Sequence, residues 1–186
     1  MRMKLCIKNM VCPRCIMVVR KIFLSVGISS LSVALGEVET EDNITERQRQ
    51  QLSAALLQAG FELLEDPLSQ TVEQLRVCVI EWVRMKGKRP KMSDYLCMRL
   101  HKDYSLLSKL FREAQGMTIE HYAITHRVEY AKELLGYNQL TTSEIAYMLG
   151  YSSPAHFSSQ FKQIAGMTPT MMRSQNLHQR IPLTDL

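Results

Sequence analysis

Hydrophobic and polar residues follow two different patterns along the chain, and the change falls near residue 66. Up to that point short alternating stretches are interleaved with stretches of helical spacing. The pattern predicts helices over 15–24 and 48–58, and strands over 3–8, 31–35, 37–40 and 61–64. Gly27 and Gly60 end the two helices. The βαββαβ order is one of the few compact arrangements open to a small α+β domain.

Beyond Asp66-Pro67-Leu68-Ser69 the sequence shows only helical periodicity. Proline cannot continue a strand, and serine favours a helix cap, so a domain boundary is expected here. We therefore predict an α+β chain with two domains, residues 1–66 and residues 67–186, of which the second is all-α.

An internal repeat with an offset of 50 residues lies in the second domain. The segment 108–118 (SKLFREAQGMT) recurs as 158–168 (SSQFKQIAGMT), with the glycine in register. One helical unit is therefore used twice.

Each copy predicts a helix-turn-helix. In the second copy Thr141 and Glu144 have capping-box spacing, Gly150 ends the first helix, and Ser153-Pro154 begins the second. In the first copy Ser93 and Asp103 are the expected caps. The 17 residues 119–135 predict a connecting helix of ~25 Å, which could hold two reading helices about one DNA turn apart.

Charge and composition narrow the function classes. The net charge of +5 arises entirely beyond residue 66, because residues 1–66 hold equal numbers of acidic and basic residues. The excess of basic residues beyond residue 66 indicates either a polyanionic partner or an ordinary basic surface. No apolar run approaches the ~20 residues of a membrane span, and five cysteines do not suggest a disulfide framework. No catalytic constellation is visible. We expect a cytoplasmic protein that is not an enzyme and has no membrane partner.

Residues ~71–175 resemble the AraC/XylS family of bacterial transcriptional regulators. The resemblance is carried by 143–162 (SEIAYMLGYSSPAHFSSQFK), 166–169 (GMTP), Arg127 and 131–135 (AKELL). Cys97 departs from the usual small alanine, and His101 from the usual glycine turn. The resemblance implies double-stranded DNA as partner, with RNA polymerase as a further expected partner. A single chain could bind two adjacent grooves; a homodimer through the first domain is the alternative.

By the same resemblance, exposed positions on the second helix of each copy contact bases. The candidates are Ser105, Ser108, Lys109 and Arg112 in the first copy, and Ala155, His156, Ser159 and Gln160 in the second. Lys109 suits guanine acceptors and Gln160 suits adenine. Arg127, Lys132 and Lys162 are expected to contact phosphates or to pack. The alternative for each is a solvated helix face.

Two cysteines, Cys12 and Cys15, lie between the first strand and the first helix. The helix dipole and Arg14 favour the thiolate, the form that binds soft metals or attacks disulfides. Two thiolates alone suit Cu(I), whereas a closed zinc site needs about two more ligands, which here requires a second subunit.

The Met10-x-Cys12-x-x-Cys15 motif and the βαββαβ order resemble the heavy-metal-associated (HMA) domain of copper chaperones and metal-transporting ATPases. The resemblance covers residues ~2–65 and includes Gly60-Phe61, while Asn9 replaces a usual glycine. It implies a ferredoxin-like fold and a site for Cu(I) or another soft metal at Cys12, Cys15 and Met10. A thiol redox switch and an inert or dimerising module are the alternatives.

The sequence thus predicts a DNA-binding transcription regulator whose first domain senses a soft metal or thiol oxidation. The alternative is a metal-trafficking, copper-chaperone-like protein whose helical half docks a partner.

Overall fold

The computed structural model describes residues 3–85, 87 and 89–174. By its internal contacts the chain forms two compact units, Met1–Val77 and Cys78–Leu186. We call them unit 1 and unit 2 and describe each by itself. Among the described residues, no helix has the length and apolar character needed to cross a bilayer.

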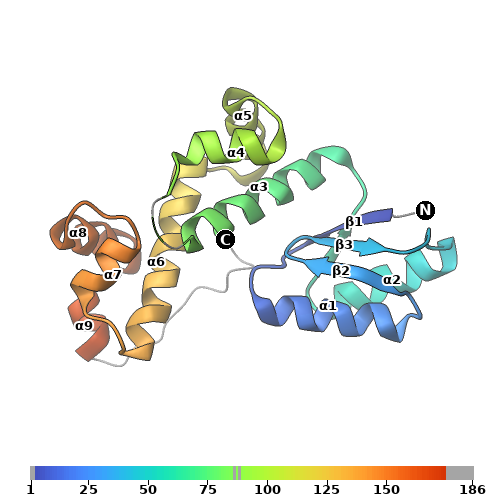
Figure 1. Cartoon of the computed structure of the whole chain (residues 1–186), viewed down its shortest axis with the longest axis horizontal. Coiled ribbons are helices and arrows are strands. Elements are labelled where there is room, and N and C mark those ends of the chain that lie inside the picture. The colour runs from blue at the N-terminus through green and yellow to red at the C-terminus, as the bar shows by residue number, and fades with distance from the viewer. Residues whose placement is uncertain (1–2, 86, 88, 175–186) are drawn as a thin grey trace. The chain divides into compact units, whose positions relative to one another are not determined.

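Unit 1 contains a four-stranded antiparallel sheet and two helices (Figure 1). The elements are β1 (Met3–Lys8), α1 (Pro13–Ser25), β2 (Ser30–Ala34), β3 (Glu37–Thr40), α2 (Glu46–Gln58) and β4 (Glu62–Leu64). The strands lie in the order β2-β3-β1-β4. All six predicted elements are present, with boundaries shifted by at most two residues.

The alternation along β1 sends its side chains to two faces. Leu5 and Ile7 join the core formed with α1 and α2, where Phe23 and Leu56 are also buried. Cys6 points to the opposite face and is 6% exposed. That face is therefore covered as well.

Helix α3 (Pro67–Arg84) accounts for this covering, because its first half belongs to unit 1. The Gln70 side chain donates to the Leu64 carbonyl at 3.0 Å. The Asn9 amide donates to Glu73 Oε1 at 3.1 Å, and Glu73 forms a buried ion pair with Arg76 at 3.1 Å. The predicted boundary at residues 66 and 67 thus coincides with the start of α3, whereas the compact units divide after Val77.

Gly36 lies close to α3. Its φ is +71°, and a Cβ placed there would lie 2.9 Å from Val77 Cγ2. We expect Gly36→Ala to destabilise unit 1 by more than the ~1–2 kcal/mol of left-handed strain alone, because the methyl group also meets Val77. Native-state hydrogen exchange of the Leu5 and Ile7 amides measures this loss.

Gly60→Ala is the matched control, since Gly60 has φ +81° but open space around it. Adding Val77→Ala to Gly36→Ala should recover part of the loss. Equal losses for the two glycines, with no recovery, would mean that α3 does not pack closely at Gly36.

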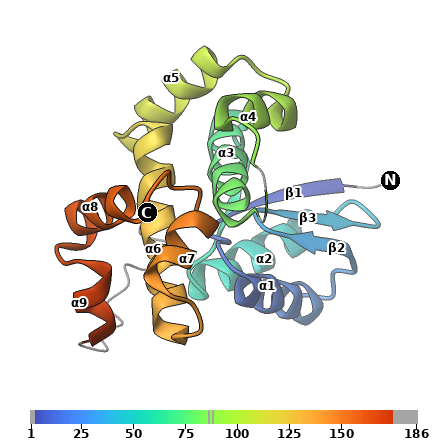
Figure 2. The same cartoon turned by 60° about the vertical axis from the view of Figure 1, so that its left-hand side comes forward.

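Unit 2 is helical and contains two helix-turn-helix pairs joined by a long helix (Figure 2). After α3 come α4 (Met92–Leu100), α5 (Tyr104–Gln115), α6 (Ile119–Tyr137), α7 (Thr142–Met148), α8 (Pro154–Ala165) and α9 (Pro169–Ser174). The predicted all-α arrangement, with two pairs on either side of α6, is confirmed.

The helix caps were predicted correctly in the second copy and less well in the first. Thr141 and Glu144 form the expected capping box, and the Ser153 side chain accepts from the His156 amide. In the first copy Ser93 is not a cap, because α4 already begins at Met92 and its N-cap is Lys91. The Ser93 hydroxyl instead donates to the Asp94 carboxylate within the helix. Asp103 is the N-cap of α5 but makes no side-chain capping bond.

Candidate functional site

Helices α5 and α8 are structurally equivalent and are the candidate reading helices. Both have 12 residues, and each begins 50 positions from its counterpart. Both end at a glycine with positive φ, Gly116 at +67° and Gly166 at +78°. Such a cap needs a residue that tolerates the left-handed region, which explains the glycine in register.

The buried sides of the two helices are equivalent as well. Leu107 and Phe111 in α5 correspond to Phe157 and Phe161 in α8, and all four are 0% exposed. Phe111 packs edge-on against Tyr122 of α6, with ring centroids 5.2 Å apart. Each reading helix therefore has one face fixed in a core and an opposite polar face exposed.

Most predicted base-contacting residues lie on these exposed faces. The exposed ones are Ser105, Lys109, Arg112, Ala155, His156 and Ser159, together with the predicted phosphate contact Lys162. Ser108 and Gln160 are half-buried. The structure thus brings these candidates onto the two helices α5 and α8.

Gln160 has a partner within the protein. The Tyr151 hydroxyl donates to Gln160 Oε1 at 2.7 Å. Adenine recognition by a Gln side chain uses both the amide oxygen and the NH₂ group. The amide oxygen of Gln160 is thus already engaged within the protein, and its adenine contact stays a prediction.

The two candidates on α6 are set back from solvent. Lys132 is 7% exposed and its ammonium bonds the Glu129 carboxylate at 2.6 Å, so it packs rather than contacting phosphates. Arg127 is half-buried, with its guanidinium over the rings of Trp82 at 5.4 Å and Tyr151 at 5.2 Å. Arg127 thus contacts the second pair through Tyr151, whereas the partner of Lys132 lies on α6 itself.

In the turn of the first helix-turn-helix pair, His101 stands where a glycine is usual. His101 ends α4 with φ +51°, in the left-handed region, at the position where Gly150 (φ +79°) ends the second pair's first helix. The turn therefore keeps the geometry of a glycine turn, at a cost in backbone strain. Cys97 on α4 is half-buried and lies one turn before it.

His101→Gly should stabilise unit 2 by about 1 kcal/mol, because glycine removes the left-handed strain but gains more freedom when unfolded. Thermal unfolding followed by circular dichroism should show a rise of a few degrees. Lys102→Gly is the control, since Lys102 does not have a positive φ. An unchanged or lower midpoint for His101→Gly would show that the turn carries no strain.

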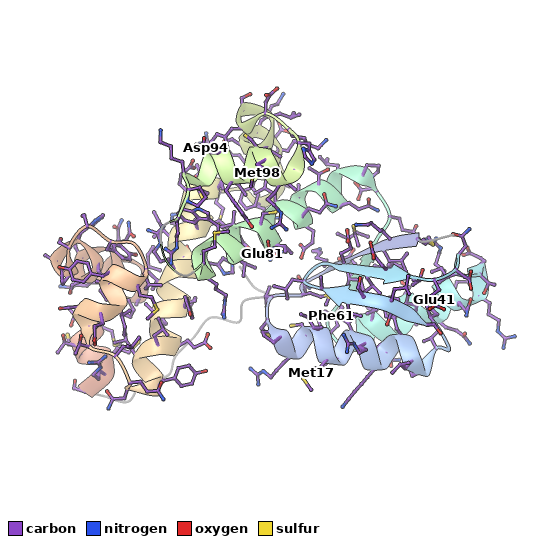
Figure 3. The ribbon with its side chains drawn as sticks, viewed as in Figure 1. Met17, Glu41, Phe61, Glu81, Asp94 and Met98 are labelled. Carbon is purple, nitrogen blue, oxygen red and sulfur yellow. The ribbon has the colours of Figure 1, made fainter. Side chains whose placement is uncertain are left out.

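A polar cluster between α3 and α4 was not anticipated. Glu81, labelled in Figure 3, accepts from the Tyr95 hydroxyl at 3.0 Å and pairs with Arg99 at 3.1 Å. Burial and the Glu81 carboxylate raise the pKa of Tyr95 to about 12, so its hydroxyl remains a donor. Tyr95 and Arg99 follow Glu81 by 14 and 18 positions in the sequence, and no short motif predicts a contact over that separation.

The two candidate metal ligands of unit 1 lie side by side. Cys12 is the N-cap of α1, and its Sγ is 3.4 Å from the Sγ of Cys15. The Cys15 thiol also approaches the Asn9 carbonyl at 3.9 Å, while the Asn9 side chain donates to the Gly60 carbonyl at 3.1 Å. Asn9 has φ +73°, which explains why a glycine suits this position and why asparagine is tolerated.

The electrostatics distinguish the two thiols. Burial opposes ionisation of Cys12, but hydrogen bonds from Cys15 and the charge of Arg14 outweigh it, so the pKa of Cys12 lies below its ordinary value. Burial raises the pKa of Cys15. Cys12 is therefore the first of the pair to become a thiolate, with Cys15 as hydrogen-bond donor to it.

Met10 does not share this position. It is 0% exposed and belongs to the core of unit 1, a cluster that also contains Phe61. No group of three or more His, Cys, Asp or Glu side chains suited to a metal occurs among residues 3–85, 87 and 89–174. The donor set is thus two thiols.

Comparison with known proteins finds matches to the helical unit. A helix-turn-helix domain family model matches residues 96–175. An uncharacterized HTH-type transcriptional regulator of Staphylococcus aureus is 34% identical over 96 residues, a match covering 45% of this chain and 13% of that protein. The chain thus matches only a small part of this longer relative.

Solved structures agree with this match. The C-terminal domain of AraT, a response regulator from Geobacillus stearothermophilus, superposes with a TM-score of 0.51 and 25% identity, covering 62% of this chain and 91% of that chain. An AraC-type DNA-binding domain-containing regulator from Chromobacterium violaceum gives a TM-score of 0.50 and 22% identity, covering 56% and 93%. These relatives are transcriptional regulators and not enzymes, as expected for this chain. Residues 96–175 therefore match a helix-turn-helix domain family, and the helical unit has the fold of these solved regulator domains.

Proposed function

We propose that the protein is a sequence-specific DNA-binding transcription regulator. The observation that carries the proposal is the equivalence of α5 and α8, two 12-residue helices with matching buried faces and exposed polar faces. Two such helices joined by α6 suit successive major grooves on one side of a duplex. The names of the matched relatives support the same function.

The test begins with selection of bound duplexes from a random pool by the full chain, followed by titration of the selected duplex at several salt concentrations. Each phosphate contact should add about −0.9 to the slope of log K against log salt. Lys109→Ala should weaken binding, and a change in base preference would mark Lys109 as a base reader.

Lys21→Ala is the matched control, because Lys21 is an exposed lysine of α1 in unit 1. It should leave affinity and preference unchanged. Failure to select any duplex, or equal effects of the two lysine variants, would contradict the proposal.

We further propose that unit 1 is an HMA-like input domain with a ferredoxin-like arrangement, which senses a soft metal ion or thiol oxidation. The strand order β2-β3-β1-β4 with two helices on the core face supports the fold. The 3.4 Å separation of Cys12 and Cys15, with one thiol biased toward ionisation, supports the chemistry.

The residues present fit a two-coordinate soft ion such as Cu(I) better than a closed zinc site, since thiolates prefer soft metals and zinc needs four ligands. Cys12 and Cys15 would hold the ion. Met10 keeps a packing role, because it would have to leave the core to become a ligand.

Metal retention tests this part. Reduced protein is incubated anaerobically with Cu(I), Zn(II) or other divalent metals, desalted and analysed for metal. The expected result is about one Cu(I) per chain or per dimer, lost in Cys12→Ser/Cys15→Ser and kept in the control Cys97→Ser. No metal retained by the wild type would contradict metal sensing and leave oxidation of the two thiols to a disulfide by a disulfide oxidant as the remaining chemistry.

Coupling is tested by repeating the DNA titration with and without bound metal, where an allosteric effect is typically ~1–3 kcal/mol. Light scattering of the same samples tests for the homodimer. Metal binding without any binding to duplex DNA would instead support the metal-trafficking alternative.

A further inference from the structure

A cavity of about 370 Å³ lies within unit 2, at the end of α7. Its lining includes Trp82 of α3, Arg89 and Pro90 from the segment before α4, Arg127 of α6, and Tyr147 and Met148 near the end of α7. The volume is within the range of small-molecule sites. Among the described lining residues two are arginines and none is acidic.

Arg89 is held rigidly at one side of this cavity. Its Nη1 and Nη2 donate to the carbonyls of Leu149 and Met148 at 2.7 and 2.9 Å, and its Nε donates to the Met85 carbonyl at 3.1 Å. These carbonyls orient the guanidinium but carry no formal charge. Burial, and then the charge of Arg127, lower the pKa of Arg89, and the described lining of the cavity offers this cation no carboxylate.

Arg127 contributes the second cation. Its guanidinium lies over the Trp82 and Tyr151 rings and interacts with the Tyr151 side chain. Its Nε is buried and has no hydrogen-bond partner among the described residues. Buried donors are nearly always satisfied in folded proteins, so Arg127, a residue of the cavity lining, retains an uncompensated donor among the described residues.

We propose that this cavity binds a small organic anion, a carboxylate or phosphate ester, through Arg89 and Arg127. Guanidinium groups match the geometry of both anions. The apolar remainder of the ligand would contact Trp82, Pro90 and Met148. Because the site touches α6 and the turn that precedes α8, an occupant would stabilise the second helix-turn-helix pair.

Trp82 makes the test direct, because it is the single tryptophan of the chain. The full chain, free of DNA, is titrated with benzoate and with phenyl phosphate while Trp82 fluorescence is followed, and binding is confirmed by calorimetry. We expect a saturable change with both anions and none with neutral benzyl alcohol. Arg127→Gln should weaken binding by at least about tenfold.

Two further variants keep the test decisive if Arg127→Gln fails to fold. Met148→Glu places a carboxylate at the partly exposed cavity edge and should also abolish anion binding. Arg112→Gln, on the exposed face of α5, should leave anion binding unchanged. The absence of a saturable response, or equal responses in wild type and Met148→Glu, would overturn the proposal. So would a response of Trp82 to duplex DNA but not to either anion, which would assign the arginines to the DNA backbone.

Discussion

Arg76→Met is expected to lower the free energy of unfolding of unit 1 by about 3–5 kcal/mol at pH 7. Glu73 and Arg76 are 3% and 4% exposed and form an ion pair of 3.1 Å, so removing the arginine leaves a buried carboxylate without its cation. The Asn9 amide, at 3.1 Å, is a single hydrogen bond and cannot replace a full charge. Hydrogen exchange of the Leu5 and Ile7 amides reports on unit 1 directly.

The same variant should show a characteristic pH dependence. Burial raises the pKa of Glu73 above its ordinary value of 4.5, although Arg76 and Asn9 act in the opposite direction. Without Arg76 the folded-state pKa rises further, so the folded protein binds this proton more tightly than the unfolded chain does. The stability that proton binding at Glu73 contributes to the variant is then fully present below about pH 4.5, and it is lost as the pH rises through the folded-state pKa of Glu73. The deficit should be small at pH 4 and largest at pH 7.

Glu73→Gln/Arg76→Met is the control, because the amide oxygen can still accept from Asn9 but no charge is buried. It should recover most of the stability at pH 7 and lose the pH slope. If Arg76→Met were as stable as the wild type, or lost the same free energy of unfolding at pH 4 and pH 7, the pair would not neutralise a buried charge.

The Glu73–Arg76 pair also shows where sequence patterns stop being informative. The periodicity of Val72, Leu75, Val79 and Val83 predicts one continuous helix, and α3 is one. Periodicity does not identify which neighbour each turn of a helix contacts, so the attachment of the first half of α3 to the sheet could not be foreseen. Charged residues on a predicted helix are normally assigned to solvent, since burial of a charge is rare unless it is paired.

The helix-turn-helix pairs were more predictable, because their signals are local. The capping box at Thr141, the proline at position 154 and the glycines at 116 and 166 each act within one or two turns of a helix. Exposure also follows from helical spacing, and the side chains of Lys109 and Ser159 are exposed as that spacing predicts.

Side chains whose surroundings come from another element were less predictable. Gln160 is engaged by Tyr151, and two of the three carbonyl partners of Arg89, those of Met148 and Leu149, lie about 60 residues away in sequence. Lys132 illustrates the same limit, because a lysine on the connecting helix suggests a phosphate contact, whereas its burial with Glu129 depends on how α6 packs.

Phe161→Ala is expected to cost unit 2 about 3–5 kcal/mol and to abolish high-affinity DNA binding. Phe161 is 0% exposed and packs edge-on against Phe157, with ring centroids 5.6 Å apart, in the core that α8 shares with α6 and α7. Loss of the ring leaves a cavity at the base of the reading helix, so α8 would no longer be held in one orientation. Urea unfolding followed by circular dichroism, and titration of the selected duplex, measure the two effects.

Phe161→Leu keeps most of the buried volume and should retain DNA binding with a smaller loss of stability. Phe111→Ala, at the equivalent position of α5, should show a loss of similar size, because Phe111 is also 0% exposed and packs against Tyr122. If Phe161→Ala stayed within about 1 kcal/mol of the wild type, the core would not fix α8. If it lost stability but still bound the duplex with full affinity, recognition would rest on α5 alone, and the equivalence of the two helices would be structural without being functional.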